Sequence, residues 1–188
     1  YGAMFILLPV SDEGLPKDLD EKKEIIQKIL RRALELGFTK EDSVVDGLVA
    51  TVGANKNAAL ETLETIRYCK EQGLATICGL SNISFGLPVR KNINQAFMVL
   101  AMNAGMDSAI VDPTNKNMIG MIYATNALLE RDEYCLQYID KFGNKASEEA
   151  AQPAPASPLD EKMQKVFKLT QDGKNKEIGQ AVQEALDA

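Results

Sequence analysis

The chain repeats one pattern four times, in which a short apolar run is followed by a segment with helical periodicity. We expect the apolar runs to be strands, and they cover residues 3–10, 43–49, 75–79 and 108–111. The helical segments cover residues 19–36, 58–72, 91–104 and 116–130. The first three helical segments end before Gly37, Gly73 and Gly105, and a glycine there is the usual signal for a helix C-terminus. Four consecutive βα units predict an α/β fold with a parallel sheet.

Two architectures accommodate this repeat. The strands follow one another at about 30 to 40 residues, which suits a (β/α)8 barrel of the TIM type, although four units are only half of one. An open doubly wound sheet is the alternative, because it needs no further strands. In a barrel, the loops at the carboxyl ends of the strands hold the functional site. The loop after residues 75–79, with the sequence GLSNISFGLPVR, is therefore a candidate site.

Composition narrows the class of protein. With 188 residues, of which 45% are hydrophobic, the chain is long enough for one ordinary core and a small appendage. A net charge of −6 argues against nucleic acid or an anionic membrane as the main partner. No apolar run approaches the ~20 residues that span a bilayer, so we expect a cytoplasmic protein. The chain opens at Tyr1, just before its first strand, which suggests a fragment of a longer protein.

The sequence contains no histidine and three cysteines without CxxC spacing. These facts argue against a classical zinc site and against nucleophiles that rely on a histidine base, so no metal site is expected. Catalysis would depend on amides, carboxylates and hydroxyls. We interpret the cysteines as small apolar core residues, and we interpret the methionines at helical spacing in the same way. The residues concerned are Cys69, Cys78, Cys135, Met98, Met102, Met118 and Met121.

The composition changes after residue 143. Residues 144–158 are rich in proline and alanine and are predicted to form a semi-stiff linker. Two short helical patterns follow, at residues 159–170 and 174–186, and their apolar stripes require a partner. The predicted organisation is therefore an α/β domain over residues 1–143, a linker over 144–158 and the start of a helical domain over 159–188.

The loop GLSNISFGLPVR, together with Ile93, Asn94 and the segment GMDSAI after the third helix, resembles the pterin-binding domain of cobalamin-dependent methionine synthase and its corrinoid methyltransferase relatives. Residues 159–188 resemble the opening of the helical cap that precedes the cobalamin-binding domain in those enzymes. The resemblance implies the C-terminal half of a (β/α)8 barrel, followed by a linker and a helical pair from the cap. It also implies a reduced folate bound at the carboxyl ends of the strands.

The resemblance also implies roles for particular residues. Asn82 matches the family's asparagine beside the nitrogen that carries the methyl group, and it is the candidate catalytic residue. Asp46 matches the aspartate that anchors the pterin, although Gly47 stands where the family usually has proline, which predicts a change in loop rigidity. Glu13 is considered together with its neighbour Asp12. The candidate pterin-binding residues are Asp46, Arg90, Asp12, Ser81, Ser84 and Asp112.

Several of these residues have simpler alternatives. Asp12 and Glu13 could be a charge pair at a helix N-terminus. Asp112 could cap the helix that follows it, and Ser81 and Ser84 could do no more than bond their own turn.

The implied function is transfer of a methyl group from methyltetrahydrofolate to a corrinoid held by another domain or protein, en route to homocysteine. A stand-alone methyltetrahydrofolate:corrinoid-protein methyltransferase is a close alternative. In other classes, the chain could be a non-catalytic half-barrel that docks to a complementary half, or an open-sheet protein that binds another cyclic ligand. The missing N-terminal half of the barrel and the cobalamin domain are the expected partners. The unpaired edge strands of a half-barrel predict a homo-oligomer.

Overall fold

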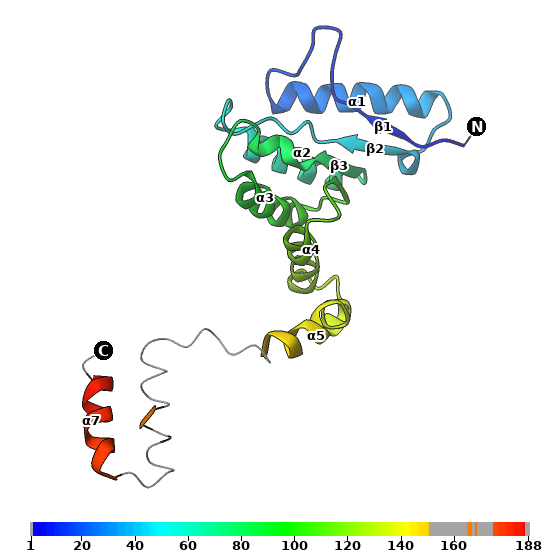
Figure 1. Ribbon diagram of the computed structural model, residues 1–188. Coiled ribbons are helices and arrows are strands. Elements are labelled where there is room, and N and C mark those ends of the chain that lie inside the picture. The colour runs from blue at the N-terminus through cyan, green and yellow to red at the C-terminus, as the bar shows by residue number, and fades with distance from the viewer. Residues whose placement is uncertain (1, 151–164, 167, 169–174, 187–188) are drawn as a thin grey trace. The chain divides into compact units, whose positions relative to one another are not determined.

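The computed structural model describes residues 2–150, 165–166, 168 and 175–186. The chain divides into two compact units, Tyr1–Tyr138 and Ile139–Ala188. Strands and helices alternate through the first unit, from blue to green in Figure 1. Its strands are β1 (Phe5–Leu7), β2 (Ser43–Asp46), β3 (Ala75–Gly79) and β4 (Ser108–Ile110). Its principal helices are α1 (Leu19–Glu35), α2 (Ala58–Glu71), α3 (Arg90–Ala104) and α4 (Lys116–Leu128).

The four strands form one parallel sheet in the order β1-β2-β3-β4. This confirms the parallel α/β fold. Right-handed crossovers between strands in sequential order place every connecting helix on the same face of the sheet. A doubly wound sheet instead reverses its strand order to cover both faces. The sequential order is therefore consistent with part of a TIM-type barrel, and it disfavours the open-sheet alternative.

The core lies between the sheet and the helices. Leu7 and Val45 pack with residues of α1 and α2 in one cluster, and Cys78 packs with residues of α2, α3 and α4 in a second. On the opposite face of β1, Ile6 is 59% exposed. Burial on one face only is typical of strands whose second face has no helical cover.

Most of the sulfur-containing side chains lie in this core. Cys69, Cys78, Met98, Met102 and Met118 are buried, as the sequence predicted. The same prediction is wrong for two residues: Cys135 is exposed, and Met121 is 40% exposed. Met121 lies on α4, whose buried face is narrow, so helical spacing alone did not show which methionines face the core.

The helices begin and end where local chemistry directs. Asp18 caps α1, because its side chain accepts a hydrogen bond of 2.9 Å from the backbone N–H of Glu21. Gly105 ends α3 with φ at +104°, in the left-handed region that favours glycine. Gly37 and Gly73 also have positive φ after α1 and α2, which confirms the predicted helix ends.

Three strands are shorter than predicted. β1 covers residues 5–7 instead of 3–10, because it pairs on one side only and Pro9 follows it. β2 ends at Asp46 because Leu48 adopts φ of +50°, which no strand residue does. β4 ends one residue early, at Ile110, whereas β3 has the predicted bounds.

Several elements were not predicted. They are the short 3-10 helices η1 (Lys40–Asp42), η2 (Leu80–Ser84) and η3 (Glu133–Cys135), and helix α5 (Leu136–Ala150). Because α5 continues to Ala150, residues 144–150 are helical where the sequence predicted the start of a linker. Helix α7 (Asn175–Leu186) agrees with the pattern at 174–186. The remaining linker and most of the pattern at 159–170 lie outside the described residues. Within the described part, no helix has the length and apolar character to cross a membrane.

Candidate functional site

Asn82 lies directly over the carboxyl end of β3. The strand ends at Gly79, and η2 follows at once, with Leu80 and Ile83 buried as its anchors. A Cβ built on Gly79 would lie 3.2 Å from Nδ2 of Asn82, so the asparagine side chain folds back over the strand end. Asn82 itself is exposed, and its amide makes no hydrogen bond to any described residue. An amide that can both donate and accept is thus open to a ligand.

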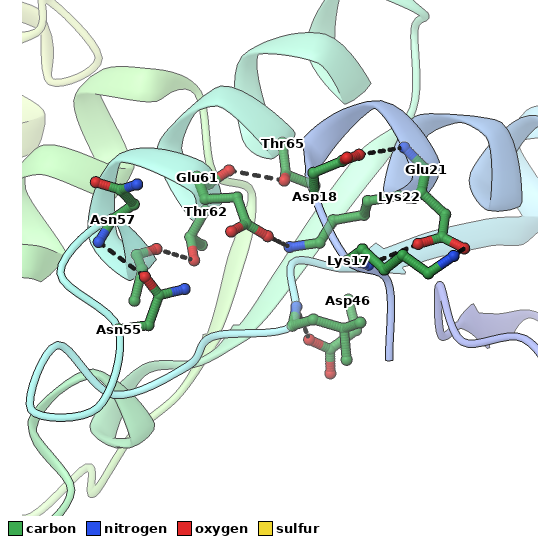
Figure 2. Close-up of polar contacts among 12 residues, drawn as sticks. Lys17, Asp18, Glu21, Lys22, Asp46, Asn55, Asn57, Glu61, Thr62 and Thr65 are labelled. Atoms are coloured by element: carbon green, nitrogen blue, oxygen red, sulfur yellow. Dashed lines mark hydrogen bonds and ion pairs between the residues drawn. The ribbon is translucent and has the colours of Figure 1, made fainter. Parts of the chain in front are cut away.

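Asp46 is the last residue of β2 and pairs in register with Ile77 of β3. One carboxylate oxygen accepts a hydrogen bond of 2.9 Å from the backbone N–H of Leu48. Figure 2 shows this contact, with the carboxylate pointing away from the ion pair of Lys22 and Glu61. The other oxygen makes no hydrogen bond within the described part of the chain. Asp46 and Asn82 therefore lie at the carboxyl ends of neighbouring strands, each with unused bonding capacity.

The surroundings of Gly47 explain why proline does not fit after Asp46. A Cβ at this position would lie 2.9 Å from Sγ of Cys78 and 3.3 Å from Cγ2 of Thr62. The Gly47 N–H also donates to the backbone oxygen of Ile77 at 2.9 Å, a bond that proline cannot make. Burial, and then the charge of Asp46, raises the pKa of Cys78 to about 11, so this thiol is protonated at neutral pH.

The loops that follow Asp46 and Asn82 are bonded to each other. The Thr51 hydroxyl donates to the backbone oxygen of Phe85 at 2.7 Å, and the Val52 N–H donates to the backbone oxygen of Ile83 at 3.0 Å. These bonds join the loop after Asp46 to the turn that carries Asn82. Leu48 and Val89 have φ of +50° and +47°, and strained backbone of this kind clusters at functional sites.

Arg90 and Ser84 are bonded to one another beneath the turn. The Arg90 Nε donates to the Ser84 hydroxyl at 3.0 Å, and its terminal nitrogen donates to the backbone oxygen of Ser81 at 2.7 Å. Ser84 is fully buried, and its hydroxyl lies 2.7 Å from Oδ1 of Asn94. The Arg90 guanidinium also lies over the Phe85 ring, 5.9 Å from its centroid. A contact between Ser84 and a ligand stays a prediction, and it would require this network to open.

Ser81 and Asp112 line one cavity of about 280 Å³, together with Asn94 and Asn115. The Asp112 carboxylate accepts hydrogen bonds from the Thr114 hydroxyl and N–H, at 2.7 and 2.9 Å. These two bonds hold the pKa of Asp112 below its usual range. Asn115 caps α4 by accepting from the N–H of Met118, so the alternative in which Asp112 caps this helix is wrong.

Asp12 and Glu13 lie apart from these residues. They line a cavity of about 770 Å³ between β1 and α1, which none of the other candidate residues lines. Asp18 is the cap of α1, so Asp12 and Glu13 do not cap that helix, and their interaction with its dipole stays a prediction. No group of three metal-ligating side chains gathers in the described part of the chain.

Sequence reasoning missed the ion pair of Lys22 and Glu61. Its Nζ to Oε1 distance is 2.7 Å, and only 3% of the Lys22 side chain is exposed (Figure 2). The pair joins the first turns of α1 and α2, behind the strand that carries Asp46. The signal was present: Lys22 stands three and four residues before Ile25 and Ile26, on the apolar stripe of α1. Asn94 was named only as part of the resemblance and was given no role, although it lies four residues after Arg90 on one helix face.

Comparison with known proteins identifies the family of this chain. The profile of the family described as pterin binding enzyme matches residues 11–112, a span that includes both strand ends of the candidate site. The chain belongs to the pterin-binding enzyme family. The resemblance drawn from the sequence is thereby confirmed at the level of the family, while the role of each site residue stays a prediction.

Three curated relatives of this pterin-binding chain are methyltransferases or methionine synthases. The chain is 35% identical over 139 residues to a methylcorrinoid:tetrahydrofolate methyltransferase of Eubacterium limosum, covering 73% of this chain and 51% of the relative. It is 32% identical over 120 residues to methionine synthase of Mycobacterium tuberculosis (strain ATCC 25618 / H37Rv), covering 59% of this chain and 10% of that protein. The methionine synthase of Mycobacterium leprae (strain TN) is 30% identical, with the same coverage. The chain thus spans about half the length of the Eubacterium relative and a tenth of the other two.

Proposed function

We propose that this chain binds methyltetrahydrofolate and takes part in methyl transfer between that folate and a corrinoid. One observation carries the proposal: Asp46 and Asn82 lie at the carboxyl ends of adjacent parallel strands, and their loops are bonded to each other. Both residues fall within the span that matches the pterin-binding family. The printed names of the relatives supply the methyl group, the corrinoid and the folate as the chemistry to test.

Asp46 would anchor the pterin. The aminopyrimidinone edge of a folate presents adjacent N–H donors, and a carboxylate can accept them as a bidentate pair. The oxygen that already accepts from Leu48 has a second lone pair, and the other oxygen is unused among the described residues. Such a carboxylate binds the substrate and does not react.

Asn82 would act on the nitrogen that carries the methyl group. When the carbon–nitrogen bond breaks, its electron pair stays on that nitrogen, which then takes a proton from solvent. A fixed amide donor stabilises the charge that develops on the nitrogen, and its other end can accept from the protonated product. The corrinoid supplies the cobalt nucleophile when it is bound. Because the chain has no histidine, no histidine of this chain ligates the cobalt.

Arg90, Ser81, Asp112 and Asp12 complete the proposed contacts with the folate. Ser81 and Asp112 already share a cavity beside Asn82's turn. One terminal nitrogen of Arg90 is free of bonds among the described residues, so the guanidinium can bond a ligand while it keeps its contacts to Ser81 and Ser84. Asp12 lines the separate cavity between β1 and α1, so its proposed contact requires the site to extend past β1.

The reverse direction is the second candidate function. The Eubacterium relative is named for methyl transfer from a methylcorrinoid to tetrahydrofolate. The same residues serve both directions, since a catalyst lowers the barrier of forward and reverse reactions alike. A role in methionine synthesis, with homocysteine as the final acceptor, is the narrower alternative that the methionine synthase relatives favour.

The proposed partners follow from the sheet. β1 and β4 each have one edge without a strand beside it among the described residues, and Ile6 and Ile110, which lie on these two strands, are 59% and 63% exposed. Unpaired sheet edges of this kind tend to pair with another strand or another chain. We therefore propose a half-barrel that pairs with a complementary half or a second copy, followed by a cap and a corrinoid domain. Analytical ultracentrifugation tests the pairing, and a monomer at high concentration with a cooperative melt would contradict it.

Methyl transfer is measured by mixing the protein, methyltetrahydrofolate and a reduced corrinoid protein, and following the corrinoid absorbance. We expect Asn82→Ala to lower the rate by ~100 to 1000-fold, the usual effect of removing one such donor. Asn103→Ala is the matched control, because Asn103 is exposed near the end of α3. Starting from methylcorrinoid and tetrahydrofolate tests the reverse direction. Equal rates for Asn82→Ala and the wild-type protein would contradict the proposed role of Asn82.

A further inference from the structure

We propose that Asn94 is a positioning residue, which acts through the buried hydroxyl of Ser84 to hold the η2 turn and so to orient Asn82. The inference rests on the proposed function, because orientation matters only if Asn82 acts on a substrate. Asn94 lines the cavity of Ser81 and Asp112, but its Oδ1 is taken up by the bond to the buried Ser84 hydroxyl. The contacts of the η2 turn, of Ser84, and of Asn94 with Arg90 support it.

The η2 turn needs support from outside itself. It is a five-residue 3-10 helix without a side-chain cap, and 3-10 hydrogen bonds have poor geometry. Leu80 and Ile83 anchor it through apolar contacts, which resist separation but do little to fix direction. Asn82 lies between these anchors, so any rotation of the turn moves its amide. The loop after β2 supplies two directional bonds, to the backbone oxygens of Ile83 and Phe85, and α3 supplies the others.

Ser84 supplies such bonds at the end of the turn. Its hydroxyl has one proton to donate, and the two acceptors within reach are Oδ1 of Asn94 at 2.7 Å and the backbone oxygen of Ser81 at 3.3 Å. The shorter distance assigns the proton to Asn94. The Ser81 oxygen is satisfied by Arg90 instead, at 2.7 Å. Arg90 Nε then donates to the lone pair of the Ser84 hydroxyl at 3.0 Å.

Asn94 and Arg90 form a rigid mount for this hydroxyl. They are four residues apart on α3, so both side chains leave the same face of the helix. Phe97, Met98 and Ala101 bury the next turns of α3 in the core and fix the helix in place. The turn that carries Asn82 is thus bonded to a fixed helix through Ser84. Catalytic geometry is sensitive to small displacements, so this mount should affect rate more than binding.

The decisive variants are Asn94→Leu, which removes the acceptor, and Asn94→Asp, which keeps an acceptor oxygen at the same place. Asn92→Leu is the matched control on an exposed position of α3. In the methyl-transfer assay we expect Asn94→Leu to lower kcat by ~10 to 100-fold, with KM for methyltetrahydrofolate changed less than about threefold. We expect Asn94→Asp to recover most of kcat, and Asn92→Leu to match the wild-type protein.

Hydrogen exchange separates this inference from the proposed function. The Phe85 N–H donates to the backbone oxygen of Asn82, so its exchange rate reports whether the turn is held. We expect faster exchange at Phe85 in Asn94→Leu than in Asn94→Asp, whether or not the protein transfers methyl groups. Unchanged exchange at Phe85 in a folded Asn94→Leu variant would overturn the inference. So would a normal kcat, or a loss of kcat that Asn94→Asp does not recover. Absence of transfer in the wild-type protein, with exchange as expected, would count against the proposed function alone.

Discussion

One aspartate lies at each end of the parallel sheet, Asp107 at the amino end and Asp46 at the carboxyl end. Both carboxylate oxygens of Asp107 accept hydrogen bonds within the described residues, whereas only one oxygen of Asp46 does. At the amino end, Asp107 accepts from Lys70 Nζ at 2.7 Å with one oxygen, and from the Thr76 N–H and hydroxyl at 2.9 and 3.3 Å with the other. At the carboxyl end, Asp46 accepts only from Leu48 among the described residues. Polar groups whose bonds are all made within the protein contribute stability, whereas unsatisfied ones are available to a ligand.

Two residues with unfavourable positive φ, Leu48 and Val89, lie in loops at the carboxyl end. Positive φ also occurs after α4, at Glu130, Tyr134 and Cys135, so backbone strain alone does not distinguish the two ends. In barrels, residues at the carboxyl ends of strands serve function and those at the amino ends serve stability. The comparison therefore makes separate predictions for the two ends, and for the buried pair that supports the carboxyl end from behind.

The largest effect is expected at the Lys22–Glu61 pair. Glu61→Ala leaves the Lys22 ammonium buried without its partner, and it should lower the free energy of unfolding by ~3–5 kcal/mol. Urea unfolding measures this change. Glu64→Ala is the control, because Glu64 lies on the same helix with 53% of its side chain exposed. The double variant Lys22→Met/Glu61→Ala should recover most of the loss. Equal effects of Glu61→Ala and Glu64→Ala would contradict a contribution of the buried pair to stability.

Gly47→Ala tests the close packing behind Asp46. The new methyl group would lie 2.9 Å from Sγ of Cys78, and overpacking of this kind costs about 1–3 kcal/mol of stability. Gly120→Ala offers the opposite case, since nothing lies near its Cβ within α4, and alanine there should stabilise by ~0.5–1 kcal/mol. Thermal melts of both variants should therefore shift in opposite directions. The same direction of shift would contradict the packing argument.

Asp107→Ala tests the amino end. It removes the acceptor of three hydrogen bonds and leaves the buried Thr76 without a partner for its N–H, which should cost ~1–3 kcal/mol of stability. Asp20→Ala is the control, because 91% of the Asp20 side chain is exposed. We expect the affinity for methyltetrahydrofolate to stay unchanged in both. A loss of affinity in a folded Asp107→Ala variant would break the division between the two ends.

The smallest expected effect is a loss of stability at acidic pH. Hydrogen bonds from the N–H and hydroxyl of Thr39, at 2.8 and 2.9 Å, hold the pKa of Asp42 below its usual value. The stabilisation is present above the pKa of the unfolded state, about 3.9, and is lost as the pH falls through the lower pKa of the folded state. Melts of the wild-type protein and Asp42→Asn should therefore differ at pH 7 and converge once the pH lies below the lowered pKa of Asp42 in the folded state. A difference that persists in acid would contradict this assignment.

The sequence predicted the order of strands and helices better than the bounds of the edge strand β1 and the short turn η2. The helices follow from apolar periodicity and terminal glycines, and β3 is buried between two strands, so its apolar run marks its full length. β1 pairs on one side only, and its apolar residues outside 5–7 remain unpaired among the described residues. The 3-10 helix η2 has no periodicity to detect, because five residues are too few.

The site was predicted in part. Asp46 and Asn82 were found because the resemblance names them, and strand ends are where such residues lie. The bonds that Ser84 makes to Asn94 and Arg90 were not, since the sequence gives no sign of which way a serine in a turn points. Tertiary packing decides this direction. The same holds for Lys22, whose burial depends on a partner 39 residues away, on another helix.

Calorimetric titration of methyltetrahydrofolate into the wild-type protein, Asp46→Ala and Asp107→Ala, each first shown to be folded, tests the account most directly. We expect the wild-type protein to bind and Asp107→Ala to bind equally well. Asp46→Ala should bind at least ~10-fold more weakly, because it loses charge-assisted hydrogen bonds to the pterin. Equal affinity of Asp46→Ala and the wild-type protein, or a loss confined to Asp107→Ala, would contradict the claim that the carboxyl end of the sheet is the pterin site.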